Sequence, residues 1–139
     1  TKLGCAQCHK LRGEGGSVGP DLNESFMRWK RNREELLTQI LEPSKIVEEK
    51  YRPIHLKTVR DEHVFGLVLE RTKEFVSVVT NPQNPVPQKI LIKDISMEKA
   101  GTLSLMPAGL LNTLDKEQIL DLAAYLEAAG DPASPLFQK

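Results

Sequence analysis

Two cysteines and a histidine near the N-terminus constrain this chain more than any other feature of its sequence. They form the segment Cys5-Ala6-Gln7-Cys8-His9, and no other cysteine occurs among the 139 residues. Residues three positions apart lie on one side of a helical turn, so both thiols can reach the same flat ligand. The C-x-x-C-H spacing is the attachment signature of a c-type haem. Each thiol then bonds one vinyl group, and the histidine becomes an axial ligand of the iron.

Three other interpretations of the same segment are weaker. A structural zinc site needs a second pair of ligands, and His55 and His63 are too far apart for the usual H-x3-5-H spacing. A thioredoxin-like redox pair would follow a strand, and the residues before Cys5 form no such strand. A disulfide between Cys5 and Cys8 would close a very small loop and stabilise little. We therefore expect one covalently attached haem c, held by Cys5, Cys8 and His9.

The composition fits a single small domain and excludes some partners. The chain has 19 basic and 19 acidic residues, and this balance argues against nucleic acid as the partner. Aromatic residues make up only 5%, so a haem could be the largest apolar body in the core. No stretch approaches the roughly 20 apolar residues of a membrane span. Because c-type haem is attached outside the bacterial cytoplasm, we expect a periplasmic or otherwise extracytoplasmic location, as part of a larger secreted protein.

The first and last parts of the chain carry helical patterns. Residues 11–20 hold four glycines and are predicted to be a loop. The apolar residues of 33–41 recur at helical spacing, Pro43 ends that helix, and Ser44 can cap a short second helix to about residue 49. Near the C-terminus, Asp115 and Gln118 have the spacing of a capping box, and the predicted helix stops before Gly130.

The middle of the chain changes to a strand pattern. Between about residues 52 and 95, alternating or β-branched runs are separated by turn residues, and three prolines lie in the last of these turns. The predicted strands cover residues 54–59, 64–69, 75–80 and 89–92. This pattern predicts a small antiparallel meander of about four strands. His55 falls on the outward face of its strand, opposite Ile54 and Leu56.

A second axial ligand for the iron would have to come from far downstream. The candidates are three methionines and two histidines: Met27, Met97, Met106, His55 and His63. Met106 precedes Pro107, and a residue before proline is kept out of the helical region. A loop of this kind can hold a methionine over the haem face, so we expect His9 and Met106 to be the two metal ligands. His55 and His63 remain less favoured alternatives.

Several segments together resemble class I cytochromes c. More closely, nearly the whole chain is similar to the haem-binding domain found in Planctomycetes and Verrucomicrobia. The matching segments are Val18-Gly19-Pro20-Asp21-Leu22, Leu41-Glu42-Pro43-Ser44, Tyr51, Ser104-Leu105-Met106-Pro107 and Asp121-Leu122-x-x-Tyr125-Leu126. The resemblance implies a mainly α fold: one cytochrome c-like domain over residues 1–139, helical over 1–52 and 96–130, with the β meander inserted at about 52–95.

The resemblance also implies further site residues and a function. The carbonyl of Pro20 would accept a hydrogen bond from the ring of His9. Trp29 either hydrogen-bonds a haem propionate or packs in the core. The expected function is electron transfer without catalysis, in exchange with a redox partner protein or a fused dehydrogenase domain. The alternative is a haem enzyme or gas sensor, which would need an open sixth position on the iron.

Overall fold

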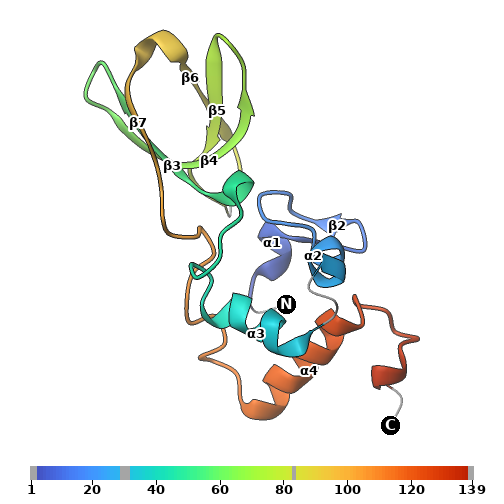
Figure 1. Ribbon diagram of the computed structural model, residues 1–139. Coiled ribbons are helices and arrows are strands. Elements are labelled where there is room, and N and C mark those ends of the chain that lie inside the picture. Colours follow the sequence, from blue (N-terminus) through green and yellow to red (C-terminus); the bar gives the residue numbers. More distant parts are fainter. Residues whose placement is uncertain (1–2, 29–31, 83, 138–139) are drawn as a thin grey trace. The chain divides into compact units, whose positions relative to one another are not determined.

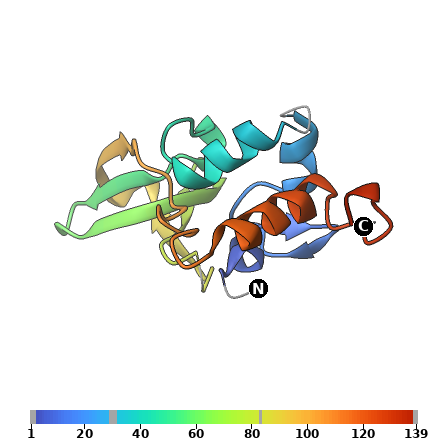
Figure 2. The ribbon, with the colours of Figure 1, turned by 90° about the horizontal axis from the view of Figure 1, so that it is seen from below.

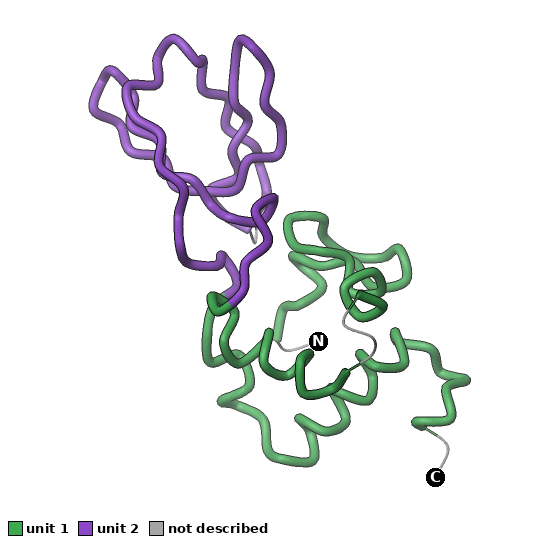
Figure 3. Tube along the Cα trace, viewed as in Figure 1, with its two compact units in different colours: residues 1–45, 107–139 green, residues 46–106 purple. Residues whose placement is uncertain are grey.

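The computed structural model describes residues 3–28, 32–82 and 84–137. The chain forms two compact units (Figure 3). Unit 1 combines Thr1–Lys45 with Pro107–Lys139, and unit 2 is the continuous segment Ile46–Met106. Unit 2 is therefore longer at both ends than the β insert expected at residues 52–95.

Unit 1 holds the α-helices of the described residues and one very short hairpin (Figure 1). Its elements are α1 (Cys5–Cys8), β1 (Lys10–Leu11), β2 (Glu14–Gly15), α2 (Leu22–Arg28), α3 (Arg33–Leu41), α4 (Lys116–Glu127) and the 3-10 turn η3 (Pro135–Phe137). The hairpin β1–β2 spans residues 10–15. Most of these residues belong to the stretch 11–20, which we predicted to be a loop throughout. Helix α3 has the predicted bounds.

The last helix, α4, begins where the capping box predicted. The side chain of Asp115 accepts a hydrogen bond from the Gln118 N–H at 2.9 Å, and the Gln118 side chain accepts one from the Asp115 N–H at 3.1 Å. At the other end, the N–H of Gly130 donates to the carbonyl of Tyr125 at 2.8 Å. These bonds satisfy backbone groups that a helix leaves without partners at its ends.

Helices α3 and α4 lie side by side in unit 1 (Figures 1 and 2). Asn32 caps α3 by accepting from the N–H groups of Glu34 and Glu35. The Nε of Arg33 donates to a carboxylate oxygen of Glu127 at 3.0 Å, which joins the start of α3 to the end of α4. The buried apolar side chains of unit 1 are Val18, Phe26, Leu111, Ala123, Leu126 and Ala128.

The short helix expected from Ser44 to about residue 49 is not formed, and that prediction is wrong. Turns follow α3 instead, and only the 3-10 turn η1 (Glu49–Tyr51) appears in this stretch. The physical reason is helix nucleation: about six residues gain few i→i−4 hydrogen bonds against the entropy lost in forming the first turn. Ile46 and Val47 are β-branched, which weakens the helix further.

Unit 2 is built around one five-stranded antiparallel sheet, in the strand order β6-β5-β4-β3-β7. Its strands are β3 (Ile54–Thr58), β4 (His63–Arg71), β5 (Phe75–Val79), β6 (Pro87–Leu91) and β7 (Ile95–Ala100), with the 3-10 turn η2 (Ile92–Asp94) before the last. The predicted meander is confirmed in β3 to β6. Strand β7 returns to pair with β3 at the far edge, and the sequence analysis missed it.

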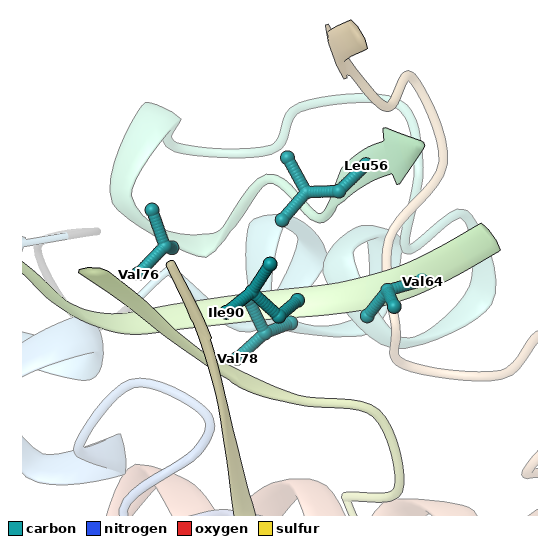
Figure 4. Packing of buried hydrophobic residues seen from close by; sticks show 5 residues of the cluster. All are labelled: Leu56, Val64, Val76, Val78 and Ile90. Carbon is teal, nitrogen blue, oxygen red and sulfur yellow. The ribbon is translucent and has the colours of Figure 1, made fainter. Parts of the chain in front are cut away.

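One face of this sheet forms the core of unit 2 (Figure 4). Leu56 pairs across the strands with Val64, and Val76 pairs with Ile90, so their side chains point to the same side. Val78 completes the cluster from β5. Because side chains alternate along a strand, His55 points to the opposite face, as predicted.

The expectation of a mainly α fold is wrong. The structure is mixed, with 31% helix and 26% strand, and its helices are short while its largest element is the five-stranded sheet. Part of the error lies in residues 96–130, which we expected to be helical and which begin with most of strand β7. Met, Glu, Lys and Ala in that strand favour helix intrinsically, but pairing with β3 overrides this preference.

Candidate functional site

The C-x-x-C-H segment forms a single helical turn at the start of unit 1. Helix α1 spans Cys5–Cys8, and the His9 N–H closes the turn by donating to the Cys5 carbonyl at 2.9 Å. Both cysteines are thiols, and their side chains are half-buried. Burial raises the pKa of the Cys8 thiol, and the neighbouring Cys5 raises it further. The turn thus presents two thiols and one imidazole within five residues.

The glycine-rich segment after α1 packs directly against the backbone of that turn. The N–H of Gly16 donates to the Ala6 carbonyl at 2.8 Å, and the N–H of Gly19 donates to the Cys8 carbonyl at 2.7 Å. A Cβ atom at Gly16 would lie 1.9 Å from the Gln7 carbonyl oxygen, which is impossible without moving the backbone. Glycine is therefore needed at position 16 so that the loop backbone can approach the backbone of α1. The sequence analysis predicted a loop here but not this role.

The imidazole of His9 is fixed by two consecutive residues of the same segment. Its Nδ1 lies 2.7 Å from the Pro20 carbonyl oxygen, so the hydrogen bond expected from the resemblance is present. A carbonyl can only accept, so Nδ1 carries a proton, and in the neutral form of the ring the lone pair lies on Nε2. That is the tautomer in which Nε2 can bind a metal.

Gly19 approaches the same ring from the side. A Cβ atom at this position would lie 2.6 Å from Cε1 and 2.8 Å from Nδ1 of His9. Gly19 therefore belongs to the candidate site, although the sequence analysis treated it only as part of the G-P-D-L segment. The sequence gives one indication of this role: Gly19 comes immediately before Pro20, the residue that accepts the hydrogen bond from His9.

A cavity of about 690 Å³ lies in unit 1 beside this turn. Its lining residues are Leu3, Cys5, Ala6, His9, Leu11, Arg12, Glu14, Gly15, Leu22, Leu114, Gln118, Leu122, Tyr125 and Leu126. Its volume is within the range of about 300–1,000 Å³ that small-molecule and cofactor sites have. Most of its wall is apolar, and one thiol and one imidazole open onto it. An apolar ligand is the kind that this wall would accept.

Polar groups lie at one part of this cavity. Arg12 lines it and donates from Nη1 to the Gly130 carbonyl at 2.9 Å, with the Asp131 carboxylate 3.8 Å away. This contact joins the hairpin of the N-terminal segment to the end of α4. Residues from both ends of the chain, within 3–22 and 114–126, thereby line one cavity.

Of the remaining predicted site residues, one belongs to unit 2 and one is not described. Met106 is the last residue of unit 2, in an irregular loop, half-buried, and its N–H donates to the Ser104 hydroxyl at 3.1 Å. Trp29 lies outside the described residues. The structure thus brings Cys5, Cys8, His9 and Pro20 together in unit 1.

Comparisons with known proteins add no family to this description. The sequence matches no protein-family model, and no curated protein is significantly similar to it.

Within the described residues, no three or more histidine, cysteine, aspartate or glutamate side chains are grouped so as to hold a metal ion. No helix in that part of the chain is long and apolar enough to cross a membrane.

Proposed function

We propose that this protein is an electron-transfer domain of the cytochrome c type, with one covalently attached haem c. The observation that carries the proposal is the His9–Pro20 hydrogen bond on the turn that bears Cys5 and Cys8. A lone C-x-x-C-H pattern can occur by chance. A C-x-x-C-H histidine whose ring is held with Nε2 ready to bind a metal is much more specific to a haem ligand.

The residues of unit 1 fit a haem. Two thiols at the attachment spacing would hold it, His9 would be the first axial ligand, and the apolar wall of the cavity would cover it. A bound haem supplies one-electron chemistry through its iron. Leucines of the wall, such as Leu22, Leu122 and Leu126, would exclude water from that environment.

Met106 is our proposed second axial ligand. The support is its place in the chain: it lies in a non-helical loop, and the peptide bond to Pro107 joins it directly to unit 1. A thioether stabilises the ferrous state relative to a second imidazole, so this pair gives a higher potential than two histidines. With His9 and Met106 both bound to it, the iron would have no position left for a substrate, which is why we propose a carrier and not an enzyme.

The same proposal extends to partners and location. Electrons would be exchanged with a redox partner protein or a fused dehydrogenase domain, outside the bacterial cytoplasm. Trp29 is proposed as a hydrogen-bond donor to a haem propionate through its indole N–H. These assignments follow from the resemblance of the sequence to cytochromes c.

Covalent attachment can be tested by mass spectrometry after extraction with acidified acetone. We expect the intact mass to exceed that of the polypeptide by one haem. The matched control is the Cys5→Ser/Cys8→Ser variant, which should lose its haem to the solvent. A wild-type protein that loses all its haem would contradict the proposal. A wild-type ferrous protein that binds carbon monoxide rapidly and stoichiometrically would favour the enzyme or gas-sensor alternative.

A further inference from the structure

The outer face of the sheet in unit 2 holds a pair of histidines that the electron-transfer proposal does not use. His55 on β3 and His63 on β4 are diagonal neighbours, because His55 pairs with Phe65 and Lys57 pairs with His63. The Nε2 atom of His55 lies 2.7 Å from the Nδ1 atom of His63. Two imidazole nitrogens from different strands therefore face each other at the surface.

The ring of His55 is held in place from its other side. It stacks on the ring of Phe65, with centroids 4.0 Å apart and an interplanar angle of 11°. Phe65 is 61% exposed, so this three-ring row lies at the surface, open to ions in solution. Backbone pairing of β3 with β4 fixes the positions of both histidines, which limits the conformational entropy that a ligand would have to remove.

We propose that His55 and His63 form a two-histidine binding site for a late first-row transition-metal dication, with Cu²⁺ as the preferred ion. In the structure, one imidazole donates its N–H to the lone pair of the other across this 2.7 Å gap. For a metal ion to bind both facing nitrogens, the donating ring must transfer its proton, through solvent, to its other nitrogen. Each ring then offers one lone pair to the metal and keeps one N–H. Water fills the remaining coordination positions at this exposed site.

The ligand type favours copper. The observed 2.7 Å is the length of an N–H···N hydrogen bond, so both rings must turn before one ion can bind the two nitrogens. Among the divalent first-row metals, Cu²⁺ binds nitrogen ligands most tightly, and its tetragonal geometry suits two neighbouring imidazoles with water in the remaining positions.

The charges around the pair are mixed. Asp61 lies in the β3–β4 turn, and its pKa is lowered by the hydrogen bond and charge of Lys57 and, to a smaller extent, by His63. The Lys57 ammonium is 2.6 Å from the Asp61 carboxylate, so its charge is largely offset. Lys99 on β7 pairs with His55 and adds one positive charge on that strand. The two histidines therefore face no large excess of positive charge from these neighbours.

The test is a titration of the full chain with Cu²⁺, by calorimetry and by electron paramagnetic resonance, with Cys5 and Cys8 blocked by their haem or by alkylation. We expect one equivalent to bind, with hyperfine couplings from two imidazole nitrogens. His55→Gln and His63→Gln should each lower the affinity about 10²-fold, because either change removes two-point attachment. The double variant should bind Cu²⁺ only slightly more weakly than either single variant.

Matched variants separate chelation from other causes. Phe65→Leu keeps both imidazoles and should retain Cu²⁺ binding within about tenfold, since it removes only the stacking surface. Amide spectra of each variant check that the sheet of unit 2 is still folded. Single variants that bind Cu²⁺ like the wild type, or a preference for Zn²⁺ over Cu²⁺, would overturn the proposal.

Discussion

The imidazole of His9 shows how single residues determine what a site can bind. The carbonyl oxygen of Pro20 holds the proton on Nδ1, and Gly19 packs against the imidazole ring. Proline lacks a backbone donor but keeps its carbonyl, so Pro20 can accept this bond without a competing N–H of its own. The tautomer and the orientation of the ring thus depend on two adjacent residues in the loop.

Gly19→Ala is expected to displace the His9 ring. The new Cβ would lie 2.6 Å from the ring, so the loop or the imidazole must shift, and overpacking of this kind costs about 1–3 kcal/mol. Urea unfolding should show the loss of stability, and the His9 ring signals or the haem spectrum should change with it.

Gly13→Ala is the matched control in the same loop. A Cβ at Gly13 meets nothing within 4 Å, although its φ of +82° strains alanine by about 1 kcal/mol. We expect a smaller loss of stability and unchanged His9 signals. Equal spectral changes in the two variants would show that the His9 signals respond to any change in this loop and not to the contact with Gly19.

Among the elements, helix α4 contributes most to the cavity wall. Leu122, Tyr125 and Leu126 face the cavity, while the buried Ala123 packs in the core of unit 1. The position of these side chains depends on where the helix begins, because a shift by one residue rotates its faces by about 100°. The capping box at Asp115 fixes that start.

Asp115→Ala should therefore lower the free energy of unfolding by about 1 kcal/mol, since the N–H of Gln118 loses its acceptor. Chemical denaturation followed by circular dichroism measures this change. Asp121→Ala is the control, because Asp121 is an exposed residue within α4 and alanine is the better helix former. A cost at Asp121 as large as that at Asp115 would contradict the assigned role of the cap.

At the scale of the whole molecule, the chain leaves unit 1 after Lys45, forms the sheet of unit 2 and re-enters unit 1 at Pro107. The proposed axial ligand Met106 is the residue at this second crossing. The β unit is thus continuous in sequence, while unit 1 is assembled from both ends of the chain.

If Met106 is the sixth ligand, the oxidised protein should show a weak long-wavelength absorption band from sulfur–iron charge transfer, and Met106→Ala should remove it. The substitution should also lower the reduction potential and let carbon monoxide bind the ferrous iron, because the sixth position becomes open. Visible spectroscopy and a redox titration measure these effects.

Met97→Ala is the matched control for Met106→Ala. Met97 lies on β7 and is 37% exposed, and we expect its loss to leave the spectrum and the potential unchanged. A spectrum unaffected by Met106→Ala, or altered by Met97→Ala, would assign the sixth ligand elsewhere.

The sequence by itself determined the features that depend on local interactions. The bounds of α3, the capping box of α4, the β3–β6 meander and the outward face of His55 were all predicted, because each follows from periodicity, capping or turn residues within a few positions. The His9–Pro20 bond was expected from a family resemblance and is present.

The tertiary structure decided the features that depend on residues far apart in sequence. Strand β7 forms because β3, some 40 residues earlier, offers an unpaired edge, and this pairing outweighs the helix preference of Met97 and Glu98. With this strand added to the sheet, the structure is mixed and not mainly α as predicted. Likewise, only the register of β3 against β4 brings His55 and His63 together. Only the packing of the loop against the C-x-x-C-H turn shows why positions 16 and 19 must be glycine. Long-range pairing and close approach leave no periodic signal in a single sequence, so local patterns could not reveal them.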